Sequence, residues 1–487
     1  MAEVDVDLHT LQQSVTYALE ALRHQATVIE AEVCATWCEY QTVRLQYDTE
    51  RAGRGVQPPQ VQTTFGLGVL LVIEDQDGRR IGFGSDAGDL SPEGLTLAVE
   101  RAKAHAVPDP YFHGLPVPLA APTIPPTFHD PQVLALHEDE ITRLAVEALD
   151  GALSTFKTAG YVQGIRVSGD VRSRKAHMVV GNTHGLLAAE TSAGLLAVIS
   201  SHLMEAQSSG MGSNVATHVH DFAPYDAGAE AAQHALRARG AVTVAAGDYA
   251  AVFSPQAVAD LMQDLVVPAL SLDTVAAGTS PFAHCLGQPI SAALLTVIDD
   301  GRRPGLLGSH GITGEGLPTG ETPLIEQGRL VGFLTDVYQA QKLAAQIGAL
   351  APHNGMRFAT HGGGFSMRPG IFPTNLLLSG THPLPLAELL APISDGIYIG
   401  GLWHTTPQGG LQSGNFTSTV IGPSCRIRHG TLAEPLHPAT LRLQGNFLDL
   451  LQRITGVSTS HRAIAFATMQ SLVLAPDIRC SQVRLVG

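Results

Sequence analysis

The stretch GDYAAVFSPQAVADLMQDLV, residues 247–266, opens the second half of the chain and predicts a short strand followed directly by a helix. The strand is expected over 249–253 and the helix over 255–267. Ser254 is well suited to cap the start of that helix, and Pro255 fits its first position, where no backbone N–H is needed. One side of the helix is apolar and is expected to be buried; its residues are Ala257, Val258, Leu261, Met262 and Leu265.

Upstream of this stretch, the pattern predicts strands with helices packed on them. Apolar and polar side chains alternate over 27–47 and 61–74, which is typical of strands, and residues 66–85 have the pattern of a β-hairpin. A Ser-Pro pair marks the start of a helix over 91–106. Further helices are expected over 8–24 and 136–153, and further strands over 163–170, 176–181 and 192–202.

Downstream, segments of 6–10 residues are separated by glycine and proline from residue 290 onward. Short segments separated by turn residues in this way predict a large mixed or antiparallel sheet system. Residues 203–228 are rich in Gly, Ser, Asn and Ala and close the first half, after which a helix is expected over 229–239. Because 487 residues exceed the size of one ordinary core, two or more domains are expected.

The charge balance argues against a nucleic-acid partner. Lys and Arg number 29 against 44 Asp and Glu, the net charge is −15, and no run of five basic residues occurs. The longest basic cluster, RSRK at 172–175, is interpreted as a solvated turn. The N-terminal segment lacks the basic and apolar regions of a signal peptide, and no apolar run of 18 residues occurs. We therefore expect a cytoplasmic protein without a membrane partner.

The cysteines and histidines are scattered rather than arranged in a metal-binding pattern. Five cysteines occur without a CxxC pair, and Cys34 and Cys38 share one face of a predicted strand, where small buried side chains explain them best. His218, His220 and Asp221 are a candidate start of a metal site, although a polar edge at a domain boundary explains them more simply. No G-x-S-x-G motif of a serine hydrolase is present.

Residues 294–343, LLTVIDDGRRPGLLGSHGITGEGLPTGETPLIEQGRLVGFLTDVYQAQKL, begin a series of short motifs. An acidic pair, Asp299-Asp300, ends a predicted strand, Glu315-Gly316 forms a turn, and a hairpin runs from 324 to 330. Further motifs lie at 179–186 (VVGNTHGL), 353–357 (HNGMR), 373–375 (PTN), 396–398 (GIY), 413–416 (SGNF) and 428–432 (RHGTL). In their order and spacing they resemble the TldD/PmbA (TldE) family, also described as modulators of DNA gyrase or as metallopeptidases. The resemblance covers nearly the whole chain, with Gly314 in place of the first acid of the family's D-E-G turn.

The resemblance implies an α+β fold in two parts. These are an N-terminal α/β domain with a mixed sheet in residues 1–225 and a larger β-rich C-terminal domain in residues 226–487. It also implies dimers that enclose a central cavity. In the TldD branch a helix carries HExxxH, whose histidines bind zinc and whose glutamate acts as a base on metal-bound water, and a cysteine near the C-terminus completes the site. Members trim unfolded peptides and mature ribosomally made peptide precursors; the TldE branch lacks HExxxH and pairs with TldD.

Aligned with that pattern without gaps, the HExxxH positions fall on Ser254, Pro255 and Ala259, and none of these side chains is a zinc ligand. The region of the expected cysteine, 461–470, reads HRAIAFATMQ. By the resemblance, we expect a TldE-like subunit with no catalytic residue, metal or cofactor of its own. Its expected partners are a peptide substrate and a TldD-like HExxxH subunit that carries zinc, in a heterodimer, or a second copy in a homodimer.

Turns and strand ends in the second half are candidates for the peptide cleft or the partner interface. They are Glu315, Gly316, Thr374, Asn375, His404, Gly414 and Asn415. Two alternatives stay open. One is a regulatory binding protein. The other is a self-sufficient metallohydrolase that uses the scattered histidines His284, His310, His353, His361, His382, His404 and His429.

Overall fold

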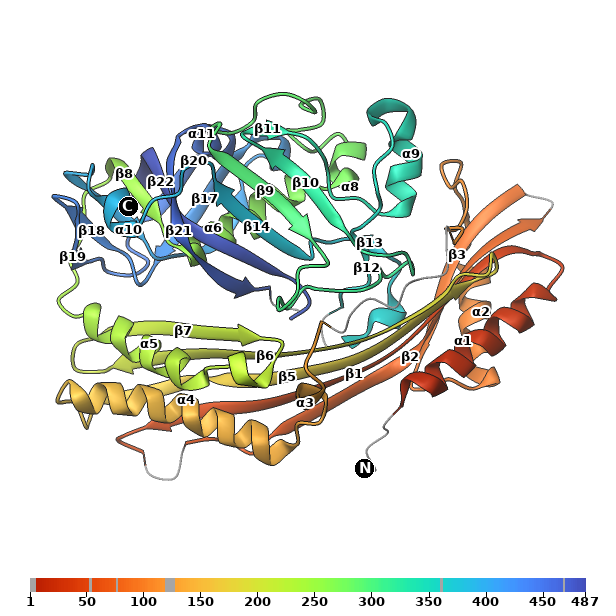
Figure 1. The fold of residues 1–487 in the computed structure, drawn as a ribbon, viewed down its shortest axis with the longest axis horizontal. Helices are drawn as coiled ribbons and strands as arrows, with labels where there is room; N and C mark the ends of the chain where they lie inside the picture. Colours follow the sequence, from red (N-terminus) through yellow and green to blue (C-terminus); the bar gives the residue numbers. More distant parts are fainter. Residues whose placement is uncertain (1–5, 52–54, 76–77, 119–127, 360–361, 467–468) are drawn as a thin grey trace.

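The computed structural model describes residues 6–51, 55–75, 78–118, 128–359, 362–466 and 469–487. Its described strands form two large sheets and one short two-stranded sheet, and the predicted α+β class is confirmed. The first large sheet comes from residues 28–216 and the second from residues 247–486. Figure 1 shows the second half of the chain above one face of the first sheet. No helix among the described residues is long and apolar enough to cross a membrane.

The first sheet has seven strands in the order β4-β3-β2-β1-β5-β6-β7. Every pairing between its described strands is antiparallel, whereas the resemblance implies a mixed sheet for this part of the chain. Connectivity is part of the reason, because β2 and β3, β5 and β6, and β6 and β7 are joined by connections of a few residues, which link antiparallel neighbours. The strands are β1 Val28–Asp48, β2 Gln60–Asp75, β3 Gly78–Ala87, β4 Val107–Pro108, β5 Ile165–Asn182, β6 Leu187–Leu203 and β7 Ser208–Ala216.

Helices cover the outer face of the first sheet (Figure 1). They are α1 Leu8–Arg23, α2 Pro92–Ala104, α3 Pro131–Leu134, α4 Glu138–Thr158 and α5 Pro224–Arg237. Ser91 caps α2, and its Oγ accepts a hydrogen bond from the Gly94 backbone N–H at 3.4 Å. α5 packs closely on β7 because Gly210 and Gly212 have no side chain; a Cβ atom on them would lie 2.3 and 2.1 Å from carbonyl oxygens of α5.

The strand β1 is buried on both faces along most of its length. Successive side chains of a strand point to opposite faces. The side chains that pack with α1 and α2 are Val33, Ala35 and Trp37. The side chains that face the second half are Glu32, Cys34, Thr36 and Cys38. Cys34 and Cys38 are both buried on this one face, as predicted.

Two predictions about β5 are wrong. A single strand replaces the separate strands expected over 163–170 and 176–181. The RSRK cluster lies inside this strand rather than in a solvated turn, and the side chains of Arg174 and Lys175 are buried. The Lys175 ammonium lies 3.3 Å from a carboxylate oxygen of Glu39 on β1, and a partner of this kind allows a charge to enter the interior.

The region that closes the first half contains more structure than its composition predicts. It includes β7, which pairs with β6, and α5 begins at Pro224, earlier than expected. His218 and His220 lie at a short 3₁₀ helix, Val219–Asp221, rather than on a strand. The domain boundary between residues 225 and 226 stays a prediction. The turn of the predicted hairpin, at 76–77, lies outside the described residues.

The second sheet system has thirteen strands and is mixed. Its main path is β11-β10-β9-β14-β22-β8-β15-β18-β19, with β16, β17, β20 and β21 attached to the side. β14 pairs in parallel with β22, and β8 pairs in parallel with β15. The strands are β8 Gly247–Phe253, β9 Leu295–Asp300, β10 Glu321–Glu326, β11 Arg329–Leu330, β14 Asn375–Gly380, β15 Asp395–Ile399, β16 Gly401–Pro407, β17 Asn415–Ile421, β18 Cys425–Arg428, β19 Thr431–Pro435, β20 Arg442–Asn446, β21 Ile454–Ala465 and β22 Leu472–Val486.

Short helices and one small sheet complete the second half. β12 Gly355–Met356 and β13 Gly370–Ile371 form a separate pair. The helices are α6 Pro255–Leu261, α7 Val267–Ala269, α8 Leu272–Ala276, α9 Val337–Ile347, α10 Leu386–Leu390 and α11 Phe447–Gln452. α6, α7, α8 and the strands around them share one large apolar core.

A buried ion pair joins the two halves of the chain. Arg357 follows β12 and donates from Nη2 to Oε1 of Glu32 on β1, and both side chains are almost fully buried. The same guanidinium donates to the carbonyl oxygen of Gly314 at 2.8 Å and to that of Met367. Because the cation has a counter-charge and further acceptors, it can be held in the interior.

Replacing Arg357 by methionine should destabilise the whole chain. The substitution leaves the Glu32 carboxylate buried without a cation, and breaking a buried ion pair in this way costs about 3–5 kcal/mol. We expect a lower midpoint of chemical denaturation, followed by circular dichroism. Arg143→Met is the matched control, because Arg143 pairs with Glu147 on the exposed side of α4 and such pairs contribute about 0.5 kcal/mol or less. Equal midpoints for the two variants would contradict the importance of the buried pair.

Candidate functional site

The three positions aligned with HExxxH lie where β8 passes into α6. Ser254 is the N-cap of α6: its Oγ accepts the Ala257 backbone N–H at 3.2 Å and donates to the Gly400 carbonyl oxygen at 2.7 Å. Pro255 is the first residue of α6, and Ala259 is buried in the core. These positions cap and pack the helix, and their side chains include no zinc ligand.

A π turn, which the sequence analysis missed, continues this helix. It spans Met262–Val266, and the Val267 backbone N–H donates to the Met262 carbonyl oxygen. A π turn joins residues five apart, which is also the spacing of the two histidines in HExxxH. Met262, Gln263 and Val267 therefore form a second set with the HExxxH spacing, and they too lack a histidine or a carboxylate. In either register, the residues of this helix do not fit zinc.

The neighbouring strand β16 carries one candidate residue, His404, at the surface. Asp260 of α6 fixes the start of β16, because its Oδ2 accepts the Leu402 backbone N–H at 2.9 Å; burial raises the pKa of this carboxyl to about 6. The pairing of β16 with β17 then shifts register after Trp403, and His404 has a φ of 53°. The ring centroids of Trp403 and His404 lie 4.0 Å apart, and Trp403 is 59% exposed.

Gly414 and Asn415 lie at the other end of the same hairpin. Gly414 has a φ of 71° and leads into β17, which begins at Asn415. The Asn446 side-chain amide donates to Oδ1 of Asn415 at 3.1 Å. The β16–β17 hairpin thus carries three of the candidate residues, with the side chains of His404 and Asn415 exposed.

The other candidates are interior residues. Thr374 and Asn375 are fully buried. Asp299 accepts the Thr374 backbone N–H at 2.7 Å and its hydroxyl at 2.8 Å, and also the Asn354 side-chain amide at 2.7 Å. The amide of Asn375 donates to the Asp300 carbonyl oxygen at 2.8 Å. This network ties β14 to β9, so these side chains are used within the fold.

Glu315 and Gly316 are also buried, close to the first sheet. The Glu315 carboxylate accepts the Val337 backbone N–H at 3.1 Å. Burial and the nearby Asp336 carboxylate raise the pKa of Glu315 well above its usual range. Gly316 has a φ of 78°, and a Cβ atom there would lie 2.4 Å from the Leu186 side chain. Gly316 therefore allows close contact with the first half, whereas the hydrogen bond of Glu315 lies within the second half.

The scattered histidines do not assemble into a recognisable metal site. Among the described residues, no group of three or more His, Cys, Asp or Glu side chains is placed to hold a metal ion. His310 and His353 are buried or half-buried, and His361 lies outside the described residues. The exposed histidines of the set are His284, His382, His404 and His429.

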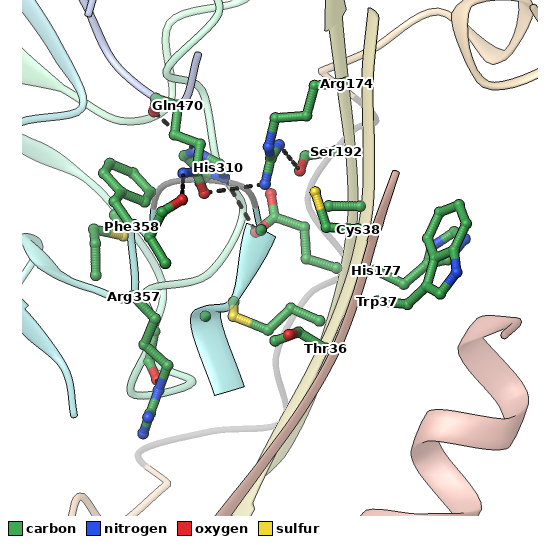
Figure 2. A pocket seen from close by; sticks show the side chains of 18 of the residues that line it. Thr36, Trp37, Cys38, Arg174, His177, Ser192, His310, Arg357, Phe358 and Gln470 are labelled. Atoms are coloured by element: carbon green, nitrogen blue, oxygen red, sulfur yellow. Dashed lines mark hydrogen bonds and ion pairs between the residues drawn. The ribbon is translucent and has the colours of Figure 1, made fainter. Parts of the chain in front are cut away.

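A cavity of about 50 Å³, with both polar and apolar side chains in its wall, lies between the two halves, lined by β1, β5, β6 and loops of the second half (Figure 2). Arg174 of β5 donates to Ser192 Oγ and to Gln470 Oε1, both at 3.0 Å. His310 Nδ1 lies 3.4 Å from Oε2 of Glu190 on β6. The sequence analysis missed this cavity, and its only sequence signal was the RSRK cluster within an alternating strand.

Asp299 should make the free energy of unfolding depend on pH, and a substitution can isolate its contribution. Burial raises its pKa from 3.8 to about 6, although the donors from Thr374 and Asn354 oppose the shift. Because the folded chain holds this proton more tightly, the free energy of unfolding should fall between about pH 4 and 6, by on the order of 2–3 kcal/mol, and level off above. Asp299→Asn should remove that contribution when chemical denaturation is repeated across this range. If the free energy of unfolding has the same slope against pH in the original chain and in Asp299→Asn, the pKa of Asp299 is not raised.

Comparison with known proteins agrees with the fold. TldE from Thermococcus kodakarensis has the same fold over 98% of this chain and 99% of its own, with a TM-score of 0.80 and 20% identity. A metalloprotease of Synechocystis is 32% identical over 36% of this chain and 34% of its own length. A TldD-homologous metalloprotease of Buchnera aphidicola is 28% identical over 40% of this chain and 38% of its own. The chain thus spans about a third to a half of the length of the curated relatives it matches.

The family model for the PmbA/TldA metallopeptidase C-terminal domain matches residues 246–487. This match begins at β8 and covers the strand, the helix α6 and the second sheet system. The fold of TldE over 98% of the chain and the similarity to a TldD-homologous metalloprotease agree with this match. The chain belongs to the PmbA/TldD family.

Proposed function

We propose that this chain is a TldE-like subunit of a metallopeptidase, and that it lacks a zinc site and pairs with a TldD-like subunit that carries HExxxH. One observation carries the proposal: the helix that follows β8 has no zinc ligand at either set of residues with the HExxxH spacing. Its cap, its proline and its apolar face all serve folding. The substrates in this proposal are unfolded or ribosomally made precursor peptides.

The β16–β17 hairpin is the surface that we propose for contact with the partner or the peptide. Among the described strands, β16 pairs with β17 alone, so it presents an edge to which an extended chain can add. Trp403 provides a large exposed ring beside that edge, and tryptophan is enriched among the residues that dominate binding energy at interfaces. His404 and Asn415 supply polar groups on the same hairpin.

Metal content and peptidase activity test the subunit role directly. The purified chain should contain far less than one zinc per molecule and should not cleave an unfolded peptide. The same chain co-expressed with an HExxxH homologue should co-purify with it and show cleavage that a chelator abolishes. An HExxxH partner in which the glutamate is replaced by glutamine is the control. Stoichiometric zinc and chelator-sensitive cleavage by this chain alone would overturn the proposal.

Trp403→Ala should weaken association with the HExxxH partner at least about tenfold, since buried aromatic anchors commonly contribute 2 kcal/mol or more. The circular dichroism spectrum should stay unchanged, because Trp403 is exposed in the free chain. Leu432→Ala is the matched control, as Leu432 is an exposed apolar residue on β19. Association is measured by analytical ultracentrifugation. Equal affinities for the two variants would exclude this hairpin as the interface.

A further inference from the structure

The cavity between the two halves holds a buried cation for which the described residues supply no ion-pair partner. Arg174 is only 7% exposed, and the ion pairs between described residues do not include it. Its two Nη atoms donate to neutral oxygens, on Ser192 and Gln470. Its Nε is buried and has no hydrogen-bond partner among the described residues. A buried charge of this kind is costly unless a counter-charge reaches it.

The groups around the guanidinium do not supply that counter-charge. The Cys38 thiol and the Tyr40 phenol lie beside it, and burial raises the pKa of both, so both are neutral at neutral pH. Glu190 lines the same cavity, and its charge helps to raise the pKa of Arg174, but the ion pairs between described residues do not join the two side chains. It accepts the Gly311 backbone N–H at 2.9 Å and lies 3.4 Å from the His310 ring.

We propose that this cavity binds a carboxylate group and that Arg174 receives it. A guanidinium carries five N–H donors in one plane. Ser192, Gln470, Tyr40 and Cys38 interact with the Arg174 guanidinium, and its Nε–H is the donor without a partner among the described residues. The Nε–H and a second hydrogen on the neighbouring Nη form an edge that matches the two oxygens of a carboxylate. Figure 2 shows the guanidinium between Ser192 and Gln470, on the side of the cavity that faces His310.

The volume of the cavity fits this ligand class. It measures about 50 Å³, room for about three or four water molecules, and therefore for a carboxylate group with a short tail. Phe358 and Ile312 add apolar surface to the wall beside the polar groups. Two sources fit this chemistry, a small free carboxylic acid and the C-terminal carboxylate of a peptide. The inference does not depend on the proposed subunit role.

Thermal unfolding of the full chain with defined ligands tests the inference. The probes are sodium acetate, trialanine and trialanine amide, each compared with sodium chloride at equal ionic strength. A ligand that binds only the folded chain raises the unfolding temperature as its concentration rises. We expect a rise with acetate, with trialanine or with both, and none with the amide. A response to acetate identifies a small free acid as sufficient, and a response to trialanine alone identifies a peptide C-terminus.

Substitutions in β5 test whether the ligand that raises the unfolding temperature binds at Arg174. Arg174→Met should lower the affinity for the responding ligand at least about tenfold, because a charge-assisted bidentate contact is lost. Arg172→Met should leave the affinity unchanged, since Arg172 lies on the same strand but pairs with Asp170 at the surface. Should Arg174→Met not fold, Arg174→Lys serves instead; it keeps the charge without the planar fork, and we expect a loss of similar size.

Three results would overturn the proposal. The first is no rise in unfolding temperature with either acetate or trialanine. The second is an equal rise with trialanine amide. The third is an unchanged response in the variants of Arg174. None of these results bears on whether the chain pairs with an HExxxH subunit, so the two proposals fail independently.

Discussion

The buried contact between the Glu32 carboxylate and the Arg357 guanidinium is the constraint on which the arrangement of the two halves depends. A charge in a protein interior is costly unless it meets a counter-charge, so the ion pair favours the observed register of the loop after β12 on β1. Other contacts between the halves lie beside this pair. Cys34 packs near Ile312, and Thr36 accepts the Phe365 backbone N–H. The cavity lined by Arg174 lies in the same contact between the halves.

The helix after β8 is built from residues that cap and pack it, and this is the basis of the proposed subunit role. A zinc site requires three or four strong ligands that converge on one point. Here the same segment is stabilised by a serine cap, a buried apolar face and the hydrogen bond from Leu402 to Asp260. Each of these contributions acts locally and accounts for the stability of the helix without a metal ligand.

Much of the fold follows from local patterns in the sequence, because caps, periodicity and turns act over a few residues. The strand and the capped helix of 247–266 are examples. The continuity of β5 could not be predicted, because Arg174 and Lys175 look solvated until their partners on distant strands are known. Thr374 and Asn375 look like accessible strand-end residues for the same reason, since Asp299 and Asp300 lie far away in sequence. The cavity combines side chains from both halves, and no local pattern contains it.

The π turn at Met262–Val266 has a consequence for how this chain is aligned with its relatives. A π turn contains one more residue than an α turn, so it is equivalent to a single-residue insertion in a regular helix. A comparison without gaps that is correct before Met262 is therefore displaced by one position after Val266, relative to any member whose helix is regular there. Equivalent residues in this helix should be assigned by superposing backbones, and an indel placed within the turn keeps the apolar faces in phase on both sides.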